Sequence, residues 1–194
     1  MGNTEILRRG DVQLTSAGTG ISHSEKTFGS TPVHFLQIWS LPTTPRLKPK
    51  YFTRFVTVSS SPRFKSDNTC RHFTDAEKRD SLVRVVASIG DEGVSSDREG
   101  SGAAPVQSPL SLYASLLSPS ASVSHVLKRS KAYIHVVQTS GYNTGKAAGA
   151  SVRIPASEVL REGDGAYIIA GAGSKIFLEN VGEGVAEVLL FDLE

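Results

Sequence analysis

The chain has 194 residues, of which 39% are hydrophobic, and a formal net charge of +2 at pH 7. Its length allows one large or two small domains. The small, dispersed charge excludes a basic tract for direct nucleic-acid binding, and no apolar run approaches the roughly 20 residues of a membrane-spanning helix. The single cysteine, Cys70, excludes an internal disulfide and fits a reducing compartment, so we expect a cytoplasmic protein, with the nucleus as an alternative.

The first part of the chain predicts short β-strands rather than helices. Apolar runs are brief and are interrupted by Gly, Ser and Pro, which is typical of a sandwich or barrel. The connection over residues 41–45 contains two prolines, which lack the N–H donor of a strand ladder, so we expect a surface turn there. The expected strands are 6–9, 12–15, 21–26, 33–40 and 51–58.

A polar linker is expected to follow these strands. Residues 59–81 include Thr74-Asp75-Ala76-Glu77, whose Thr-x-x-Glu spacing predicts a capping box and a short helix before Leu82. We therefore predict an N-terminal domain over residues 1–58, a linker with a short helix over 59–81, and a C-terminal domain over 82–194.

The C-terminal region carries enough predicted strands to close a small barrel. A glycine-rich loop over residues 90–105 is too poor in apolar side chains to be expected to order. About five strands in the first part cannot close a barrel alone, so we expect an open sheet packed on the C-terminal barrel. The predicted C-terminal strands are 82–88, 110–114, 122–127, 132–139, 151–154, 165–170, 174–179 and 186–192.

His23 and Glu25 are the candidate metal ligands. In a strand over residues 21–26 they project to the same side, and imidazole with carboxylate suits iron, manganese, nickel, copper or zinc. Two protein ligands alone give weak binding, because water must complete the coordination without preorganised geometry. His34 is interpreted as a packed or hydrogen-bonded residue rather than a ligand, and the other histidines lack a His-x-His or His-x-Glu neighbour.

The stretch from Gly10 to Glu25, followed by Val33-His34-Phe35-Leu36-Gln37-Ile38-Trp39, resembles the pirin family. It is most similar to the quercetin 2,3-dioxygenase-like branch. Pirins are two-domain cupins, so the resemblance implies an all-β bicupin with a complete C-terminal barrel and an incomplete N-terminal one. The similarity continues through Phe73–Arg79, Leu82–Ala87, Leu112–Ala114 and Glu187–Asp192.

The resemblance also implies a metal site and an activity. In the family an iron-type metal is held by a His-x-His pair on an earlier strand and by residues matching His23 and Glu25. The first pair would lie upstream of Met1, so we expect a chain without those strands, with metal weakly bound or absent and activity impaired. The implied reaction is flavonol cleavage by dioxygen, in which Glu25 is the general base for the flavonol hydroxyl proton. The alternative is a non-catalytic binding or transcription-cofactor-like protein that acts as a homodimer or with a protein partner.

Overall fold

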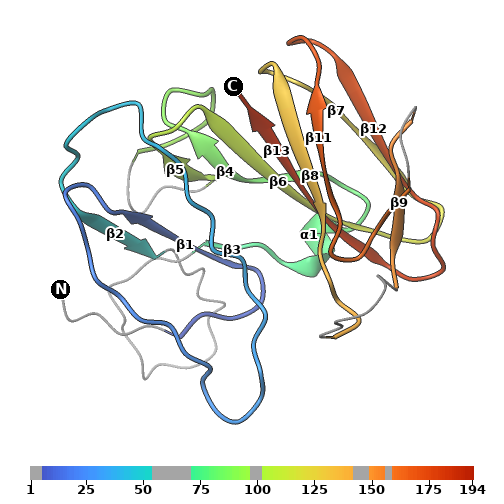
Figure 1. Ribbon diagram of the computed structural model, residues 1–194, viewed down its shortest axis with the longest axis horizontal. Coiled ribbons are helices and arrows are strands. Elements are labelled where there is room, and N and C mark those ends of the chain that lie inside the picture. Colours follow the sequence, from blue (N-terminus) through green and yellow to red (C-terminus); the bar gives the residue numbers. More distant parts are fainter. Residues whose placement is uncertain (1–5, 54–70, 97–101, 142–148, 156–158) are drawn as a thin grey trace.

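Figure 1 shows the computed structural model, which describes residues 6–53, 71–96, 102–141, 149–155 and 159–194. Within these residues the regular structure is almost entirely β, with a single short helix, α1 (Asp75–Lys78). The strands form three sheets. Nowhere in these ranges does a helix reach the length and apolar character needed to cross a membrane.

The two larger sheets belong to the C-terminal part of the chain. All their strand pairs are antiparallel except β4 with β5. The six-stranded sheet has the order β11 (Gly165–Ile169), β8 (Lys131–Val136), β13 (Ala186–Leu193), β6 (Leu110–Leu117), β4 (Val83–Ser88) and β5 (Ala104–Val106). The four-stranded sheet has the order β10 (Val159–Arg161), β9 (Ser151–Arg153), β12 (Lys175–Asn180) and β7 (Ser122–Val126).

The main hydrophobic core lies between these two sheets, which are together called the barrel. In β8 and β13 every second side chain is buried, as a strand with one face on the core requires. Ile134 and Leu190 are directly opposite each other in the register and are both fully buried, and Leu178 of β12 joins the same core. Each such side chain stabilises the fold by about 1.5–3 kcal/mol through the apolar surface it buries.

A smaller three-stranded sheet is formed by the first part of the chain. Its order is β2 (Lys50–Thr53), β1 (Asp11–Ser16) and β3 (Arg71–His72), with both pairs antiparallel. Val12 of β1 packs against a second hydrophobic cluster that includes the buried Phe73. This cluster fastens the small sheet beside β4 and β5 (Figure 1).

Polar contacts reinforce this attachment at two further points. Nη2 of Arg9 lies 2.9 Å from Oε2 of Glu187 on β13. The buried Ser108 hydroxyl donates a hydrogen bond of 2.7 Å to the Leu41 carbonyl. The first part of the chain therefore packs on the C-terminal part, as expected, through a sheet whose strands β1 and β2 lie in the predicted N-terminal domain and whose strand β3 lies in the predicted linker.

Several predicted N-terminal strands are wrong. The strand expected at 12–15 is observed as β1, but the described residues 6–9, 21–26 and 33–40 form no strand. A strand needs a neighbour to accept and donate its backbone hydrogen bonds, and no described segment pairs with these stretches. Of the strand expected at 51–58, residues 51–53 belong to β2 and the rest lie outside the described residues.

The C-terminal predictions agree much better with the structure. Each of the eight predicted strands is observed to within a few residues, and α1 begins with the predicted capping box at Thr74. The strands β5 and β10 were not predicted. The glycine-rich loop expected at 90–105 ends in β5, where Ala104 is buried and pairs in parallel with Val86. Cys70 and residues 97–101 lie outside the described residues, and the proposed division into domains stays a prediction.

Candidate metal site

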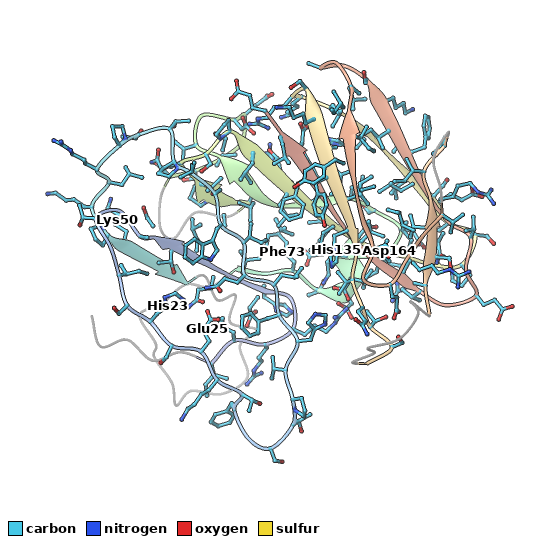
Figure 2. The ribbon with its side chains drawn as sticks, viewed as in Figure 1. His23, Glu25, Lys50, Phe73, His135 and Asp164 are labelled. Atoms are coloured by element: carbon cyan, nitrogen blue, oxygen red, sulfur yellow. The ribbon has the colours of Figure 1, made fainter. Side chains whose placement is uncertain are left out.

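His23 and Glu25 lie side by side on the irregular segment that follows β1. Nε2 of His23 is 3.8 Å from Oε1 of Glu25, and the two side chains are 43% and 32% exposed (Figure 2). The spacing of two residues brings the imidazole and the carboxylate together even though the expected strand is absent from these described residues. Both side chains of the pair are accessible from solvent.

Gln37 adds a third polar group that the sequence analysis missed. Its Nε2 lies 3.5 Å from Nε2 of His23, across a separation of 14 residues. The signal in the sequence is weak, because a single glutamine in an apolar stretch is easily explained as a surface residue. Only the path of the chain between residues 25 and 37 brings this amide to the imidazole.

The donor set fits a divalent transition metal. One imidazole nitrogen and one carboxylate oxygen are ligands for iron, manganese, nickel, copper and zinc. Neighbouring ligands of an ion that binds nitrogen and oxygen at about 2.1 Å stand about 3 Å apart, so a small side-chain rotation would let His23 and Glu25 share one ion. Within the part of the chain that the structure describes, no group of three or more His, Cys, Asp or Glu side chains could hold a metal ion.

His34 and His135 meet where the N-terminal segment lies against the barrel. Nδ1 of His34 is 3.2 Å from the Gln138 carbonyl oxygen, as expected for a hydrogen-bonded rather than metal-binding residue. Burial lowers the pKa of His135, and the neighbouring His34 lowers it further, against the partial compensation of Asp164. Figure 2 shows His135 and Asp164 on the barrel, apart from His23 and Glu25.

His72 and His125 each pair with a carboxylate. Nδ1 of His72 is 2.8 Å from Oδ1 of Asp11, which joins β3 to β1. Nε2 of His125 is 3.0 Å from Oδ2 of Asp192, which is fully buried. Burial acts to raise the pKa of Asp192, but hydrogen bonds from His125 and from two backbone N–H groups outweigh it and lower that pKa. Both pairs stabilise the fold, so His72 and His125 are not assigned to the candidate metal site of His23 and Glu25.

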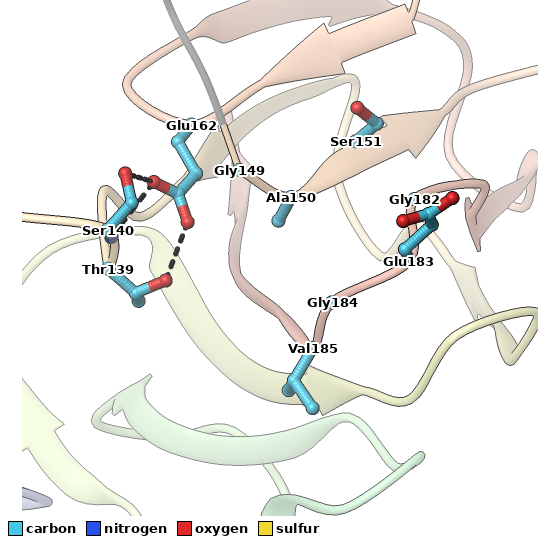
Figure 3. A pocket seen from close by; sticks show the side chains of 10 residues that line it. All are labelled: Thr139, Ser140, Gly149, Ala150, Ser151, Glu162, Gly182, Glu183, Gly184 and Val185. Carbon is cyan, nitrogen blue, oxygen red and sulfur yellow. Dashed lines mark hydrogen bonds between the residues drawn. The ribbon is translucent and has the colours of Figure 1, made fainter.

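A pocket of about 580 Å³ opens on the C-terminal part, and neither His23 nor Glu25 lines it (Figure 3). One of its two carboxylates, Glu162, is 5% exposed and accepts hydrogen bonds from the hydroxyls of Thr139 and Ser140. Burial acts to raise the pKa of Glu162, but these bonds and those from the Ser140 and Ala150 backbone N–H groups outweigh it and lower the pKa from 4.5 to about 2. The buried Glu162 carboxylate therefore joins the segments that carry Ser140 and Ala150. Hydrogen bonds from within the protein occupy its oxygens. The pocket is lined by Thr139, Ser140, Gly149, Ala150, Ser151, Glu162, Gly182, Glu183, Gly184 and Val185.

The chain has an all-β fold of the cupin type. The crystal structure of YhhW from Escherichia coli superposes with a TM-score of 0.50 at 18% identity, over 79% of this chain and 47% of that one. This likeness confirms the all-β cupin fold that the sequence predicts.

Sequence comparison relates parts of the chain to known proteins. Residues 1–40 match the family model described as Pirin. A quercetin 2,3-dioxygenase of Escherichia coli is 46% identical over 55 residues, which are 28% of this chain and 24% of that enzyme. A Pseudomonas aeruginosa relative is 38% identical over 88 residues, which are 40% of this chain and 37% of the relative. The family-model match over residues 1–40 agrees with the predicted resemblance to the pirin family.

The matches cover the relatives only in part. The chain spans about a quarter of the length of the Escherichia coli enzyme and about half of YhhW. The matched family model includes both His23 and Glu25, since it extends over residues 1–40. An activity for this chain is therefore a proposal that depends on its own residues.

Proposed function

We propose that this chain is a pirin-type metal-binding protein related to quercetin 2,3-dioxygenases, with His23 and Glu25 as ligands of a divalent transition metal. The observation that carries the proposal is the 3.8 Å separation of His23 Nε2 and Glu25 Oε1, in a segment that matches the Pirin model. By family resemblance the metal is iron, with manganese, nickel, copper and zinc as alternatives. Two ligands without strand support give weak binding, so we expect catalysis to be impaired.

The chemistry expected of such a site is flavonol cleavage. A bound metal would supply a Lewis acid and a place for the adjacent oxygens of a flavonol such as quercetin. The Glu25 side chain is 32% exposed and lies beside His23 at the proposed metal site. Its carboxylate can therefore accept the flavonol hydroxyl proton. His23 contributes a neutral imidazole that fixes where the ion sits relative to Glu25.

Metal stoichiometry tests the proposal directly. The full 194-residue chain would be loaded with iron, dialysed against a weak chelator and measured by elemental analysis, together with His23→Ala and His34→Ala variants. We expect a substoichiometric metal content that His23→Ala abolishes and His34→Ala preserves, because His34 is engaged with the Gln138 carbonyl. Equal metal content in all three proteins would remove His23 from the site and overturn the proposal.

Oxygen consumption with quercetin then tests the activity. We expect slow uptake that depends on added metal and falls to background in Glu25→Gln, which keeps the size of the side chain but removes the base. Uptake that persists in Glu25→Gln would exclude Glu25 as the general base.

A second candidate function is non-catalytic binding to a protein partner or a second copy of the chain. It is favoured by the apolar segment 33–41, whose largest side chains are strongly exposed, with Trp39 at 86% and Leu41 at 90%. Such a contiguous apolar surface is typical of an interaction site. Sedimentation of the purified chain at increasing concentration distinguishes a second copy from a protein partner. Self-association raises the average mass, whereas a chain that binds only a foreign partner keeps a constant mass.

A further inference from the structure

Gln37 contacts the His23 imidazole through its side-chain amide. Within the described structure, the contact with Nε2 of His23 at 3.5 Å is the hydrogen bond in which its amide takes part. Leu36 and Ile38, its neighbours in sequence, are apolar and about half exposed. The Gln37 amide therefore points toward His23, whereas the neighbouring Leu36 and Ile38 expose apolar surface to solvent.

The contact involves the His23 nitrogen that could bind a metal. Which of the two groups donates depends on the imidazole tautomer, and an amide N–H can donate to Nε2 when the imidazole proton is on Nδ1. A lone pair on Nε2 is what a metal ion needs from a neutral imidazole. The same nitrogen is the one that faces Oε1 of Glu25.

A rotation of the Gln37 amide by half a turn exchanges its nitrogen and oxygen. The oxygen then occupies a position about 3.5 Å from Nε2 of His23. Ligands that share one ion stand about 3 Å apart, so this oxygen is close enough to bind the same ion after a small adjustment.

We infer that Gln37 is a third protein ligand of the metal held by His23 and Glu25, bound through its side-chain amide oxygen. The inference rests on the proposed function and extends it by one residue. The resulting set of one nitrogen and two oxygens carries a single negative charge from Glu25. This set favours divalent ions with mixed nitrogen and oxygen ligation, such as nickel or iron, over the soft monovalent copper ion.

Nickel binding to the full chain tests this role without reference to activity. Calorimetric titration of nickel chloride would be made on the chelator-treated wild type and on Gln37→Leu, Gln37→Glu and Gln107→Leu. We expect Gln37→Leu to bind about tenfold more weakly, in the range found when residues that support a metal site are removed. Gln37→Glu restores an oxygen at the same position and should bind at least as tightly as the wild type.

Gln107→Leu makes the same chemical change in the connection between β5 and β6 and should leave the affinity unchanged. Far-ultraviolet circular dichroism on each variant checks that the strands are retained. Unchanged nickel binding by Gln37→Leu would overturn the inference. Tighter binding would also overturn it, because it would show that the Gln37 amide competes with the metal for His23. If Gln37→Leu binds normally while His23→Ala does not bind, the proposed function stands without Gln37. A wild type that binds no nickel overturns both.

Discussion

The backbone N–H of Phe73 donates a hydrogen bond of 3.0 Å to the carbonyl oxygen of Gly10. This bond continues the pairing of β3 with β1 to the point where the chain turns toward α1. Phe73 is 1% exposed and anchors the second hydrophobic cluster, so the contact with Gly10 positions the small sheet on the barrel. The close approach is available because residue 10 has no side chain.

Replacement of Gly10 by alanine should loosen this junction. Gly10 has a φ of +88°, and an added Cβ would stand 2.5 Å from the Phe73 carbonyl oxygen. We expect Gly10→Ala to lower the free energy of unfolding by about 2–4 kcal/mol, from backbone strain together with overpacking. Urea denaturation followed by circular dichroism measures the change. Gly90→Ala is the matched control, because Gly90 has a φ of +99° with no atom within 4 Å of the added Cβ. A loss equal to that of Gly90→Ala would show that the close contact costs nothing.

Glu162 should make the stability of the barrel depend on pH in acid. Its pKa is about 2 in the folded chain and 4.5 ordinarily. A lowered pKa means that its stabilisation is complete above pH 4.5 and is lost as the pH falls toward 2. Glu162→Gln leaves hydroxyl and N–H donors unsatisfied and should cost about 1–3 kcal/mol at pH 7.

The difference in the free energy of unfolding between wild type and Glu162→Gln should therefore decrease from pH 7 to pH 4 and to pH 3, as measured by urea denaturation. Glu183→Gln, at the exposed carboxylate that lines the same pocket, should change stability by less than about 0.5 kcal/mol. A difference for Glu162→Gln that stays constant over this range would show that the ionised carboxylate does not stabilise the fold.

Asp192 should be one of the most sensitive polar positions. It is fully buried and accepts hydrogen bonds from His125 Nε2 and from the backbone N–H groups of Lys128 and Arg129. Asp192→Asn presents an amide N–H₂ to at least one of these donors, so we expect a loss of about 2–4 kcal/mol in thermal or denaturant unfolding.

The matched control for Asp192 is an exposed carboxylate of the same barrel. Glu179 is 44% exposed and pairs with Arg153 at 3.3 Å, so Glu179→Gln should cost less than about 1 kcal/mol. Similar losses in the two variants would contradict the importance of burial at Asp192.

The segment between β1 and β2 should open before the barrel does. Its described residues 17–49 belong to no strand or helix, and local unfolding is easiest where backbone hydrogen bonds are fewest. In limited trypsin digestion we expect cleavage after Lys26 and Arg46 well before cleavage after Arg153 or Lys175, which lie in β9 and β12. Mass spectrometry over time gives the order. Early cleavage in β9 or β12 would show that the barrel is the less stable part.

Local sequence signals were sufficient for much of the C-terminal part. The alternation of buried and exposed residues in β8 and β13 reflects a period of two that can be read from neighbouring residues. The capping box at Thr74 likewise depends on residues only three apart, and it begins α1 as predicted. The same reasoning wrongly predicted a strand over residues 33–40. Their apolar composition favours a strand, but no described strand lies beside them.

The sequence by itself determined the all-β class, most barrel strands, the resemblance to the pirin family and the local pairing of His23 with Glu25, because each depends on short-range patterns or on recognisable motifs. Tertiary structure alone decided that Ala104–Val106 pairs with β4, that Gln37 reaches His23 and that Asp192 meets His125 across 67 residues. These contacts depend on how distant segments pack, and the chain between them carries no periodic signal of the meeting.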